Sequence, residues 1–455
     1  MRRVLVSTFG CKLNQYDSQV ISESFASKGF ELSSDMLTAD VCVVNTCSVT
    51  ARSDYEARQL VRRILRINPR VLMLVTGCYA QRAPQEIAHI GGVGLVAGNA
   101  EKSSLPELVE SLCDGGETRV SARASTDGEV RVNGEARIEV SSPGGVEECR
   151  AVPDWMSHVP TFQRRSRALV KIQDGCDGSC SYCVVPSVRG RSKSEPIERI
   201  LEQVKYLSAS GFREVVLTGA RTGSYGNDLG DGYSLETLLG ALVRGEDGLR
   251  FRLSSLEPGE VSASLVEYMA QEEKVCRHFH VPVQSCDSEI LRAMHRPYSP
   301  TEYVEKIQMI HSRFCDACIG SDVIVGFPGE TESAFARTYG TIEKLPLSYL
   351  HVFPFSRRPG TRASDMKQEP TRSVKRARAF ALRALGMRKK SAFAESQVGT
   401  FAEAVLEEEV EPGLFKGTTG NYLKVLVRAN GKRVKDAIPV KIALRTNDTL
   451  LARAC

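Results

Sequence analysis

Residues 169–183 read LVKIQDGCDGSCSYC, a short apolar strand followed by Cys176, Cys180 and Cys183 with the spacing CxxxCxxC. Three thiolates at this spacing can hold three irons of a 4Fe-4S cluster, which leaves the fourth iron open to bind a substrate. The alternatives are a zinc loop or three incidental thiols, but structural zinc normally needs four ligands and no fourth Cys or His lies nearby. The loop therefore indicates an iron-sulfur site.

This strand is the first of six that alternate with helical stretches. The series consists of Leu169–Gln173, Val215–Thr218, Phe251–Ser254, Phe279–Val283, Ile319–Gly326 and Tyr349–Phe355. Six β/α units predict a partial, TIM-like (β/α)6 barrel over residues 166–392, with its chemistry at the carboxyl ends of the strands.

Residues 1–115 predict an α/β domain with a parallel sheet. Strand-like runs alternate with helical patterns such as Ser53–Ile67; the runs are Val4–Phe9, Val41–Asn45, Val71–Thr76 and Val93–Val96. Residues 116–165 are rich in Ser, Gly, Glu and Arg with weak periodicity, so we interpret them as a linker or insertion and assign no fold.

Residues 393–455 show short alternating strands, which predict a small β-barrel. The strands are Phe401–Leu406, Tyr422–Val427 and Ile438–Ala443, with a turn at Asn430-Gly431.

The composition limits the class of protein. The 455 residues suffice for roughly three domains, and 42% hydrophobic with 25% charged residues is typical of a soluble globular protein. No apolar run reaches the roughly 18 residues of a membrane span and no signal-peptide pattern is visible, so we expect a cytoplasmic protein without membrane contact. There, 14 cysteines favour metal or catalytic roles over disulfides. A net charge of +5 matters only where it is concentrated.

Three further cysteines each follow a different predicted strand of the first domain: Cys11 in VLVSTFGC, Cys47 in VCVVNTC and Cys78 in VLMLVTGC. Parallel strands end at one edge of the sheet, where ligands bind, so we expect these thiols to converge. A buried structural cysteine is the usual interpretation of any one of them. Cys42 lies inside its strand and is expected in the core.

The cysteine loop resembles that of the radical S-adenosylmethionine (SAM) superfamily, in which the residue before the last cysteine, here Tyr182, is typically aromatic. The resemblance implies SAM contacts at or near the strand ends. These are Thr218, Gly219 and Ala220 at the methionine amino group, Gln284 and Ser285 near the ribose, and Val323 to Gly329 (including Val325), Val352 and Phe353 beside the adenine.

Five motifs together resemble the tRNA methylthiotransferases over nearly the whole chain: GCKLNQYDS (10–18), VVNTCSVT (43–50), GCYAQ (77–81), VPSVRGRSKS (185–194) and FPFSRRPGT (353–361). The resemblance implies two 4Fe-4S clusters, the SAM cluster on the loop cysteines and an auxiliary one on Cys11, Cys47 and Cys78, and a terminal TRAM barrel that binds RNA. It implies a deoxyadenosyl radical that takes hydrogen from C2 of an adenine. The implied partners are tRNA, a sulfur donor and a one-electron donor such as flavodoxin or ferredoxin.

Lys12, Leu13 and Tyr16, with RGRSKS, most resemble the branch that acts on N6-threonylcarbamoyladenosine next to the anticodon. The alternatives are the branches acting on isopentenyladenosine in tRNA or on a ribosomal-protein aspartate, and an RNA-binding iron-sulfur protein that is not an enzyme. Cys286 stands where the family commonly has Gly, so either the backbone there avoids positive φ or a local turn has changed.

Residues 372–390 (RSVKRARAFALRALGMRKK) form a basic helical run without Asp or Glu. We expect four residues to pack inward, Val374, Phe380, Leu382 and Leu385, and four to meet phosphates, Arg376, Arg383, Lys389 and Lys390. In the barrel, we expect Phe415 and Tyr422 to stack on bases beside Lys416 and Lys424. A solvated helix face is the alternative for the helix.

Other residues receive structural interpretations. We expect Cys315 and Cys318, beside His311, to pack in the core rather than form a metal or redox site. His278, His280 and His351 are interpreted as satisfied interior groups. Glu257 either faces the substrate or makes a cap or loop contact.

Overall fold

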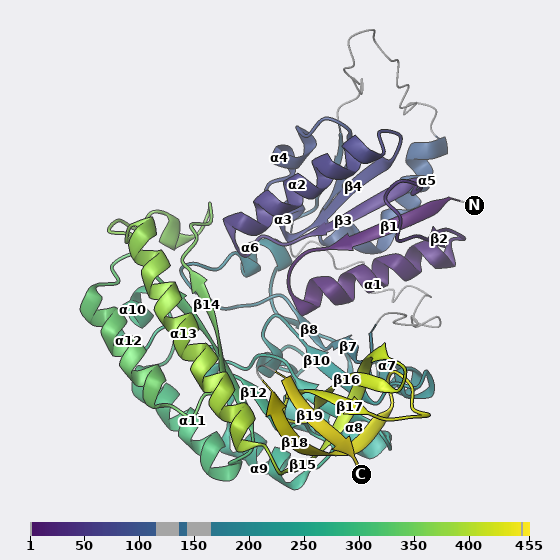
Figure 1. Cartoon of the computed structure of the whole chain (residues 1–455). Coiled ribbons are helices and arrows are strands. Elements are labelled where there is room, and N and C mark those ends of the chain that lie inside the picture. Colours follow the sequence, from purple (N-terminus) through teal and green to yellow (C-terminus); the bar gives the residue numbers. More distant parts are fainter. Residues whose placement is uncertain (1, 115–135, 143–164, 447–448) are drawn as a thin grey trace. The chain divides into compact units, whose positions relative to one another are not determined.

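The computed structural model describes residues 2–114, 136–142, 165–446 and 449–455 (Figure 1). The chain forms two compact units. Unit 1 comprises Met1–Thr161, Gly175–Asp177 and Cys183–Arg191, and unit 2 comprises Phe162–Asp174, Gly178–Tyr182 and Ser192–Cys455.

Unit 1 is built on a six-stranded parallel sheet with the order β2-β1-β3-β4-β5-β6. The strands are β1 (Arg3–Thr8), β2 (Glu31–Leu32), β3 (Val41–Thr46), β4 (Leu72–Gly77), β5 (Val93–Ala97) and β6 (Arg137–Glu139). The parallel sheet is confirmed. The pattern does not indicate β2 or β6, since both are too short for an alternation to show. β6 lies in the predicted insertion, of which residues 116–135 and 143–164 lie outside the described residues.

Helices cover both faces of this sheet (Figure 1). One face carries α1 (Lys12–Ser27) and α5 (Leu105–Asp114), which follows η1 (Ala100–Ser104); the other carries α2 (Ala51–Ile67), α3 (Cys78–Arg82) and α4 (Pro84–Ala88). In α2, the buried Ala57, Val61 and Ile64 recur at helical spacing, and the Thr50 side chain caps the first turn. In such a doubly wound fold, ligands bind at the carboxyl edge of the sheet.

The core of unit 2 contains the six predicted β/α units, so the partial barrel is confirmed. Its strands form two parallel sheets, β11-β10-β7 and β12-β13-β14. Two single bridges, Phe251 with Val275 and Ser255 with His280, connect these sheets. The strands are β7 (Ala168–Lys171), β10 (Glu214–Thr218), β11 (Arg250–Leu253), β12 (His278–His280), β13 (Cys318–Val325) and β14 (Tyr349–Pro354). A small antiparallel pair, β8 (Gln173–Asp174) and β9 (Lys193–Ser194), flanks the cysteine loop in sequence.

Helices connect the strands of the partial barrel, and the last long helix follows β14 and leads into the terminal strands. The helices are α7 (Ile197–Ala209), α8 (Leu235–Gly245), α9 (Ala263–Gln271), α10 (Ser288–Ala293), α11 (Pro300–Arg313), α12 (Glu332–Lys344) and α13 (Arg372–Ser396), with the short η3 (Thr222–Ser224), η4 (Pro258–Glu260) and η5 (Arg362–Ser364). The helix α6 (Val185–Arg189) belongs to unit 1.

The last five strands close into a barrel with the order β15-β16-β17-β19-β18, which confirms the predicted small β-barrel. They are β15 (Phe401–Glu411), β16 (Leu414–Thr419), β17 (Lys424–Arg428), β18 (Ala437–Thr446) and β19 (Thr449–Ala454). The pattern does not indicate β16 (LFKGTT) and β19 (TLLARA), because they hold few β-branched residues in alternation. Among the described residues, no helix is long and apolar enough to cross a membrane.

Candidate active site

The three dispersed cysteines follow the ends of neighbouring strands in unit 1. In the register of the sheet, Thr8 of β1 lies opposite Asn45 of β3, and Asn45 lies opposite Thr76 of β4. Cys11, Cys47 and Cys78 come two or three residues after these positions. Because β1, β3 and β4 are adjacent and parallel, the structure brings the three thiols to one edge of the sheet.

Glycines precede two of these cysteines because the backbone leaves no room for a side chain. Gly10 has a φ of +99°, and a Cβ atom on it would lie 2.7 Å from Cys47 Sγ. Gly77 has a φ of +96°, and its Cβ would lie 2.4 Å from Thr46 O. Glycine alone tolerates both the conformation and the close approach. The loop of Cys11 therefore lies directly against Cys47.

The thiols form a sulfur-rich site in which Cys47 is buried, Cys78 is half-buried and Cys11 is exposed. Cys47 is 4% exposed, and burial raises the pKa of its thiol to about 12, a rise to which the neighbouring Cys78 and Cys11 add. Such a thiol is protonated at neutral pH and becomes a ligand when iron replaces its proton. Three convergent sulfur ligands fit an iron-sulfur cluster, whereas a hard cation would require oxygen.

Buried polar side chains lie behind the cysteines. Asn14, in the first turn of α1, donates through Nδ2 to Phe9 O (2.8 Å) and Thr46 O (2.9 Å). Thr46 Oγ1 in turn donates to Thr76 O at 2.6 Å. These bonds connect the three loops that carry the cysteines. Sequence reasoning did not single these residues out, although polar residues that close apolar strands, as in VVNTC and LVTGC, are a signal for them.

Replacing Asn14 with Ala is expected to loosen the cysteine site. The change leaves the buried Thr46 carbonyl without this donor, at a cost of about 1–3 kcal/mol. Both the unfolding free energy and the iron content of reconstituted protein should fall. Asn68→Ala is the matched control, because Asn68 Nδ2 also donates to two carbonyls, Met36 O and Ala39 O, near the amino ends of the strands. The control should lose stability but keep its iron, and equal iron loss in both variants would contradict the role of Asn14.

Two motifs that lie 175 residues apart meet within unit 1. Arg189 donates through Nη2 to Asn14 Oδ1 (2.6 Å) and to Asp17 Oδ2 (3.0 Å), and Lys102 Nζ lies 2.6 Å from the same Asp17 oxygen. Asp17, Lys102 and the Arg189 side chain are all buried. Removing one partner would leave a buried charge uncompensated. The segment Cys183–Arg191 is therefore held firmly against α1.

The cysteine loop contributes Cys176 and Cys183 to unit 1 and Cys180 to unit 2. In unit 2, Arg296 Nη1 lies 3.3 Å from Cys180 Sγ, and its Nη2 pairs with Glu257. Glu257 also caps η4, so it makes the predicted cap contact. A guanidinium at this distance can hydrogen-bond a sulfur ligand of a cluster and thereby tune it.

Several residues expected to contact SAM lie around the strand ends of unit 2. Tyr182 packs edge-on against Phe327, with 6.4 Å between ring centres. Thr218 ends β10, and Gly219 lies so close to Gln173 that a Cβ atom would be 2.8 Å from its Oε1. Phe353 of β14 is 39% exposed. A ligand bound at the carboxyl ends of the strands of the partial (β/α)6 barrel would lie at such positions.

Other expected SAM contacts have their side chains turned away. Ser285 is fully buried, with its hydroxyl 3.2 Å from Thr338 Oγ1. Val325 and Val352 are buried on the opposite strand faces from Ile324 and Phe353. Ser285, Val325 and Val352 can therefore reach a ligand on the face of Phe353 only through their backbone atoms.

The departure at Cys286 has a local explanation. Among the described residues, the positive φ in this segment belongs to Gln284 (+62°), not to Cys286. Cys286 is buried, and its N–H donates to Thr338 Oγ1 at 3.1 Å. The backbone at Cys286 avoids positive φ, so a cysteine fits where the family commonly has Gly.

The basic helix over residues 372–390 is confirmed as part of α13, but its exposed side differs from the expected one. Arg376, Arg383 and Lys390 are exposed. Lys389 is not, because its Nζ lies 3.0 Å from Glu343 O and 2.6 Å from Leu345 O, at the end of α12. Phe380, expected to pack inward, is 75% exposed. Leu382 and Leu385 are buried as expected, and Arg378, Ala379 and Gly386 complete the buried side.

The prediction that Phe415 and Tyr422 of the terminal barrel stack on RNA bases is wrong. Phe415 is 1% exposed and belongs to the barrel core. Tyr422 has a φ of +66° and stacks on His278, with 4.3 Å between ring centres, so its ring is engaged within unit 2. Lys416 and Lys424 are exposed, but they pair with Glu408 and Glu407 of β15.

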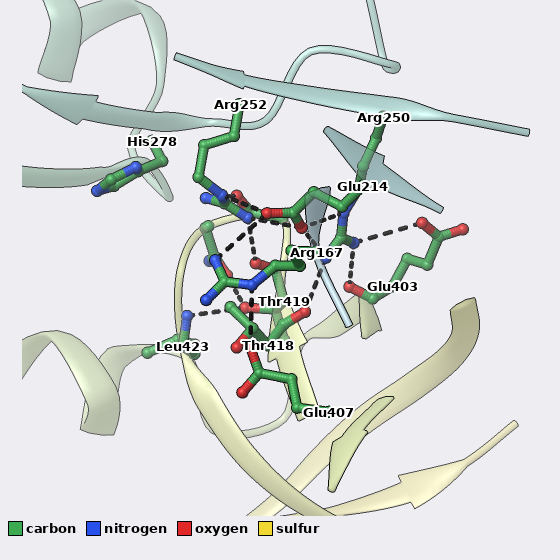
Figure 2. Close-up of polar contacts among 12 residues, drawn as sticks. Arg167, Glu214, Arg250, Arg252, His278, Glu403, Glu407, Thr418, Thr419 and Leu423 are labelled. Atoms are coloured by element: carbon green, nitrogen blue, oxygen red, sulfur yellow. Dashed lines mark hydrogen bonds and ion pairs between the residues drawn. The ribbon is translucent and has the colours of Figure 1, made fainter. Parts of the chain in front are cut away.

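A buried carboxylate lies where the barrel meets the core of unit 2 (Figure 2). Glu214 of β10 pairs at 2.7 Å with both Arg250 and Arg252 of β11. Both arginines also reach the barrel: Arg250 donates to Thr418 O at 2.7 Å, and Arg252 donates to Thr419 O at 3.0 Å. The barrel is thus docked through backbone carbonyls at the turn that carries Tyr422.

Glu214 is expected to make docking of the barrel sensitive to acid. Burial alone would raise the pKa of Glu214, but Arg252 and Arg250 lower it. The pKa in the folded state therefore lies well below the value of about 4.3 that an exposed Glu has. The folded state therefore binds fewer protons than the unfolded state. The stabilisation is present above about pH 5 and is lost as the pH falls through 4 towards the folded pKa.

Glu214→Gln should lower the free energy of unfolding at pH 7 by about 3–5 kcal/mol, because it leaves buried arginines uncompensated. It should also flatten the decline below pH 5, as measured by urea unfolding. The control is Glu202→Gln, at an exposed position of α7 with no ion pair among the described residues. A steep acid decline in Glu214→Gln equal to that of the unchanged protein would rule out this carboxylate as its source.

The remaining interpretations are partly confirmed. Cys42 is buried in the core, as expected. Cys315 and Cys318 are both predicted to lie in the core, but Cys318 is buried and Cys315 is exposed, so the prediction is correct only for Cys318. His278 and His280 are buried with hydrogen-bond partners. His351 is not an interior group, since 55% of its side chain is exposed.

Comparison with known proteins follows the same division of the chain. The profile of the Radical SAM superfamily matches residues 170–342, and the profile named Uncharacterized protein family UPF0004 matches residues 3–98. A solved structure of the radical S-adenosylmethionine methyltransferase TsrM from Kitasatospora setae is 16% identical, with a TM-score of 0.55, and covers 80% of this chain and 77% of its own. The fold and the cysteine loop define a radical SAM enzyme.

Similarity to curated proteins extends over nearly the full length. The threonylcarbamoyladenosine tRNA methylthiotransferase MtaB of Bacillus subtilis is 34% identical over 97% of this chain and 94% of its own. The protein of that name from Aquifex aeolicus is 37% identical over 90% of this chain and 93% of its own. The tRNA-2-methylthio-N(6)-dimethylallyladenosine synthase of Pelotomaculum thermopropionicum is 31% identical over 97% of this chain and 95% of its own. The chain belongs to the tRNA methylthiotransferase family.

Proposed function

We infer that this chain is a radical SAM enzyme that transfers a methylthio group to C2 of N6-threonylcarbamoyladenosine next to the anticodon in tRNA. The observation that carries the inference is the convergence of Cys11, Cys47 and Cys78 in a chain that also has the radical SAM barrel. The choice of nucleoside rests on the relatives, because those named for threonylcarbamoyladenosine reach 34% and 37% identity against 31% for the synthase named for dimethylallyladenosine.

The proposed sites divide the work between the two sets of cysteines. Cys176, Cys180 and Cys183 would hold the SAM cluster, and Cys11, Cys47 and Cys78 the auxiliary cluster. When bound, the clusters and SAM supply the radical and the sulfur chemistry, which protein side chains cannot provide. Asn14 positions the auxiliary cysteines, and Arg296 contacts Cys180. Tyr182, Thr218, Gly219, Gln284 and Phe353 would orient SAM and exclude water.

The nucleosides of tRNA from cells with and without the gene test this function. Mass spectrometry should find 2-methylthio-N6-threonylcarbamoyladenosine only when the gene is present. Loss of the methylthiolated isopentenyladenosine instead would assign the chain to that branch, and loss of a methylthiolated ribosomal-protein aspartate would assign a protein substrate. Purified protein that forms no 5′-deoxyadenosine on reduction would favour the RNA-binding protein that is not an enzyme. The reaction further requires a sulfur donor and a one-electron donor, and its tRNA substrate would place it in the cytoplasm.

We propose that tRNA contacts one side of α13. Arg376, Phe380, Arg383, Met387 and Lys390 recur every three or four residues and therefore lie on one side of the helix, which we call the α13 stripe. Phe380 and Met387 are 75% and 67% exposed, although both are apolar. Exposed apolar groups between cations suit a nucleic acid, because the cations meet phosphates while the ring stacks on a base.

Replacing Arg376, Arg383 and Lys390 with Ser is expected to weaken tRNA binding and flatten its salt dependence. Each lost phosphate contact should reduce the slope of log K against log salt concentration by about 0.7–0.9. The charge-matched control replaces Arg62, Arg63 and Arg66, three exposed arginines of α2. An equal effect of both triple variants, measured by filter binding at several salt concentrations, would remove the α13 stripe as the binding site.

A further inference from the structure

A continuous run of hydrogen bonds, which we call the lumen chain, crosses β12, β13 and β14 through His278, Tyr349, His280, Asp322 and His351. His278 Nε2 and His280 Nδ1 each lie 2.9 Å from the Tyr349 hydroxyl. His280 Nε2 lies 2.9 Å from Asp322 Oδ1, and His351 Nδ1 lies 3.0 Å from the same oxygen. The sequence pattern does not reveal this chain, because its members come from three strands.

The lumen chain lies on the strand faces that lead towards the cysteine loop. Asp322 and Ile324 are two residues apart on β13 and share a face, and Ile324 packs in the same cluster as Tyr182. His351 and Phe353 likewise share a face of β14, with 6.5 Å between ring centres. His351 therefore lies next to the strand end where SAM is proposed to bind.

His351 is the open end of the chain. His278 and His280 are 3% and 8% exposed, whereas the His351 side chain is 55% exposed. Asp322 accepts from Nδ1, and in the part of the chain that the structure describes no hydrogen-bond partner lies at Nε2. Burial would raise the pKa of Asp322, but hydrogen bonds from His280 and His351 lower it below its usual range. An ionised Asp322 thus orients the ring with Nε2 on the open side.

We propose that His351, oriented by Asp322, binds the carboxylate of the threonyl arm of the target nucleoside, an assignment that rests on the proposed function. The arm carries the negative charge that distinguishes this base from unmodified adenine and from isopentenyladenine. A protonated imidazole between two carboxylates donates one N–H to each. A site built to hydrogen-bond a polar group rejects analogues without it far better than an apolar pocket rejects a polar group.

A divalent metal is the competing occupant, because ligand atoms of His280, Asp322 and His351 lie within 4.8 Å of one another. The arrangement of protons favours the carboxylate. With one proton per link, His278 donates to Tyr349, Tyr349 donates to His280, and His280 and His351 donate to Asp322, so every link is satisfied without a metal.

The test compares two anticodon stem-loops, one with N6-threonylcarbamoyladenosine and one with its methyl ester, in which the negative charge is removed. The unchanged enzyme should prefer the free acid by about 10- to 100-fold in kcat/KM for methylthiolation, as expected for one charge-assisted hydrogen bond. In His351→Phe this ratio should fall to near one. His311→Phe, at an exposed position of α11, should keep the preference. If His351→Phe is inactive, the ratio of dissociation constants for the two stem-loops, and the variant His351→Gln, give the same comparison.

Two kinds of result would overturn the assignment, one in the substrate preference and one in the metal content. One is a preference for the free acid that is as large in His351→Phe as in the unchanged enzyme, or a ratio near one in the unchanged enzyme. The other is the loss from His351→Phe of one stoichiometric metal ion that is not cluster iron, since this would identify a metal site. An unchanged enzyme that does not modify the threonylcarbamoyladenosine stem-loop would instead refute the proposed function.

Discussion

Replacing Cys47 with Ala is expected to abolish methylthiolation and to lower the iron content of anaerobically reconstituted protein from about eight atoms to about four. Cys47 lies between Cys11 and Cys78 in the sheet order, and Gly10 packs directly against its side chain. Two remaining thiols cannot hold a cluster that needs three. Formation of 5′-deoxyadenosine should continue, because the cysteine loop is untouched.

Cys42→Ala is the matched control for this experiment. Cys42 lies inside β3, the strand that Cys47 follows, and is fully buried, but it belongs to the apolar core behind the site. Its replacement should cost about 1 kcal/mol or more of stability through a small cavity, while both clusters and the product remain. Full product formation by Cys47→Ala would refute a role for the auxiliary site in sulfur delivery.

Replacing Cys176, Cys180 and Cys183 together with Ala is expected to eliminate SAM cleavage. The triple variant should retain about four irons, on Cys11, Cys47 and Cys78, and should form no 5′-deoxyadenosine on reduction. The expected loss is complete, because no side chain can replace an open iron in chelating SAM.

Cys315→Ala provides the control, since Cys315 is an exposed cysteine of unit 2 outside both sets. It should retain about eight irons and normal SAM cleavage. Deoxyadenosine formation by the triple variant would show that the cysteine loop does not hold the SAM cluster.

The convergence of the auxiliary cysteines could be predicted because it depends on only two local features. Each cysteine follows an apolar strand, and helical patterns between the strands require parallel pairing. The network behind the cysteines could not be predicted in the same way. Asn14 reaches Thr46 and Arg189, and the second of these lies 175 residues away in the sequence.

The predicted RNA-binding residues show where local reasoning fails. Charge and helical periodicity correctly indicate α13, but they do not tell that Lys389 reaches carbonyls at the end of α12. Likewise, Tyr422 is aromatic and lies beside Lys424, yet its positive φ and His278 decide where its ring goes. Exposure depends on what lies opposite a residue, and that neighbour comes from another element.

The amino-acid sequence by itself determined the α/β class, the partial barrel, the terminal β-barrel and both sets of three cysteines, because periodicity and spacing are carried by residues close together in the chain. Only the tertiary structure decided that Glu214 docks the terminal barrel through Arg250 and Arg252, and that Asp322 contacts His351 at Nδ1, which leaves Nε2 without a hydrogen-bond partner among the described residues. These contacts join different strands, and hydrogen bonds between side chains distant in sequence have no local pattern from which to predict them.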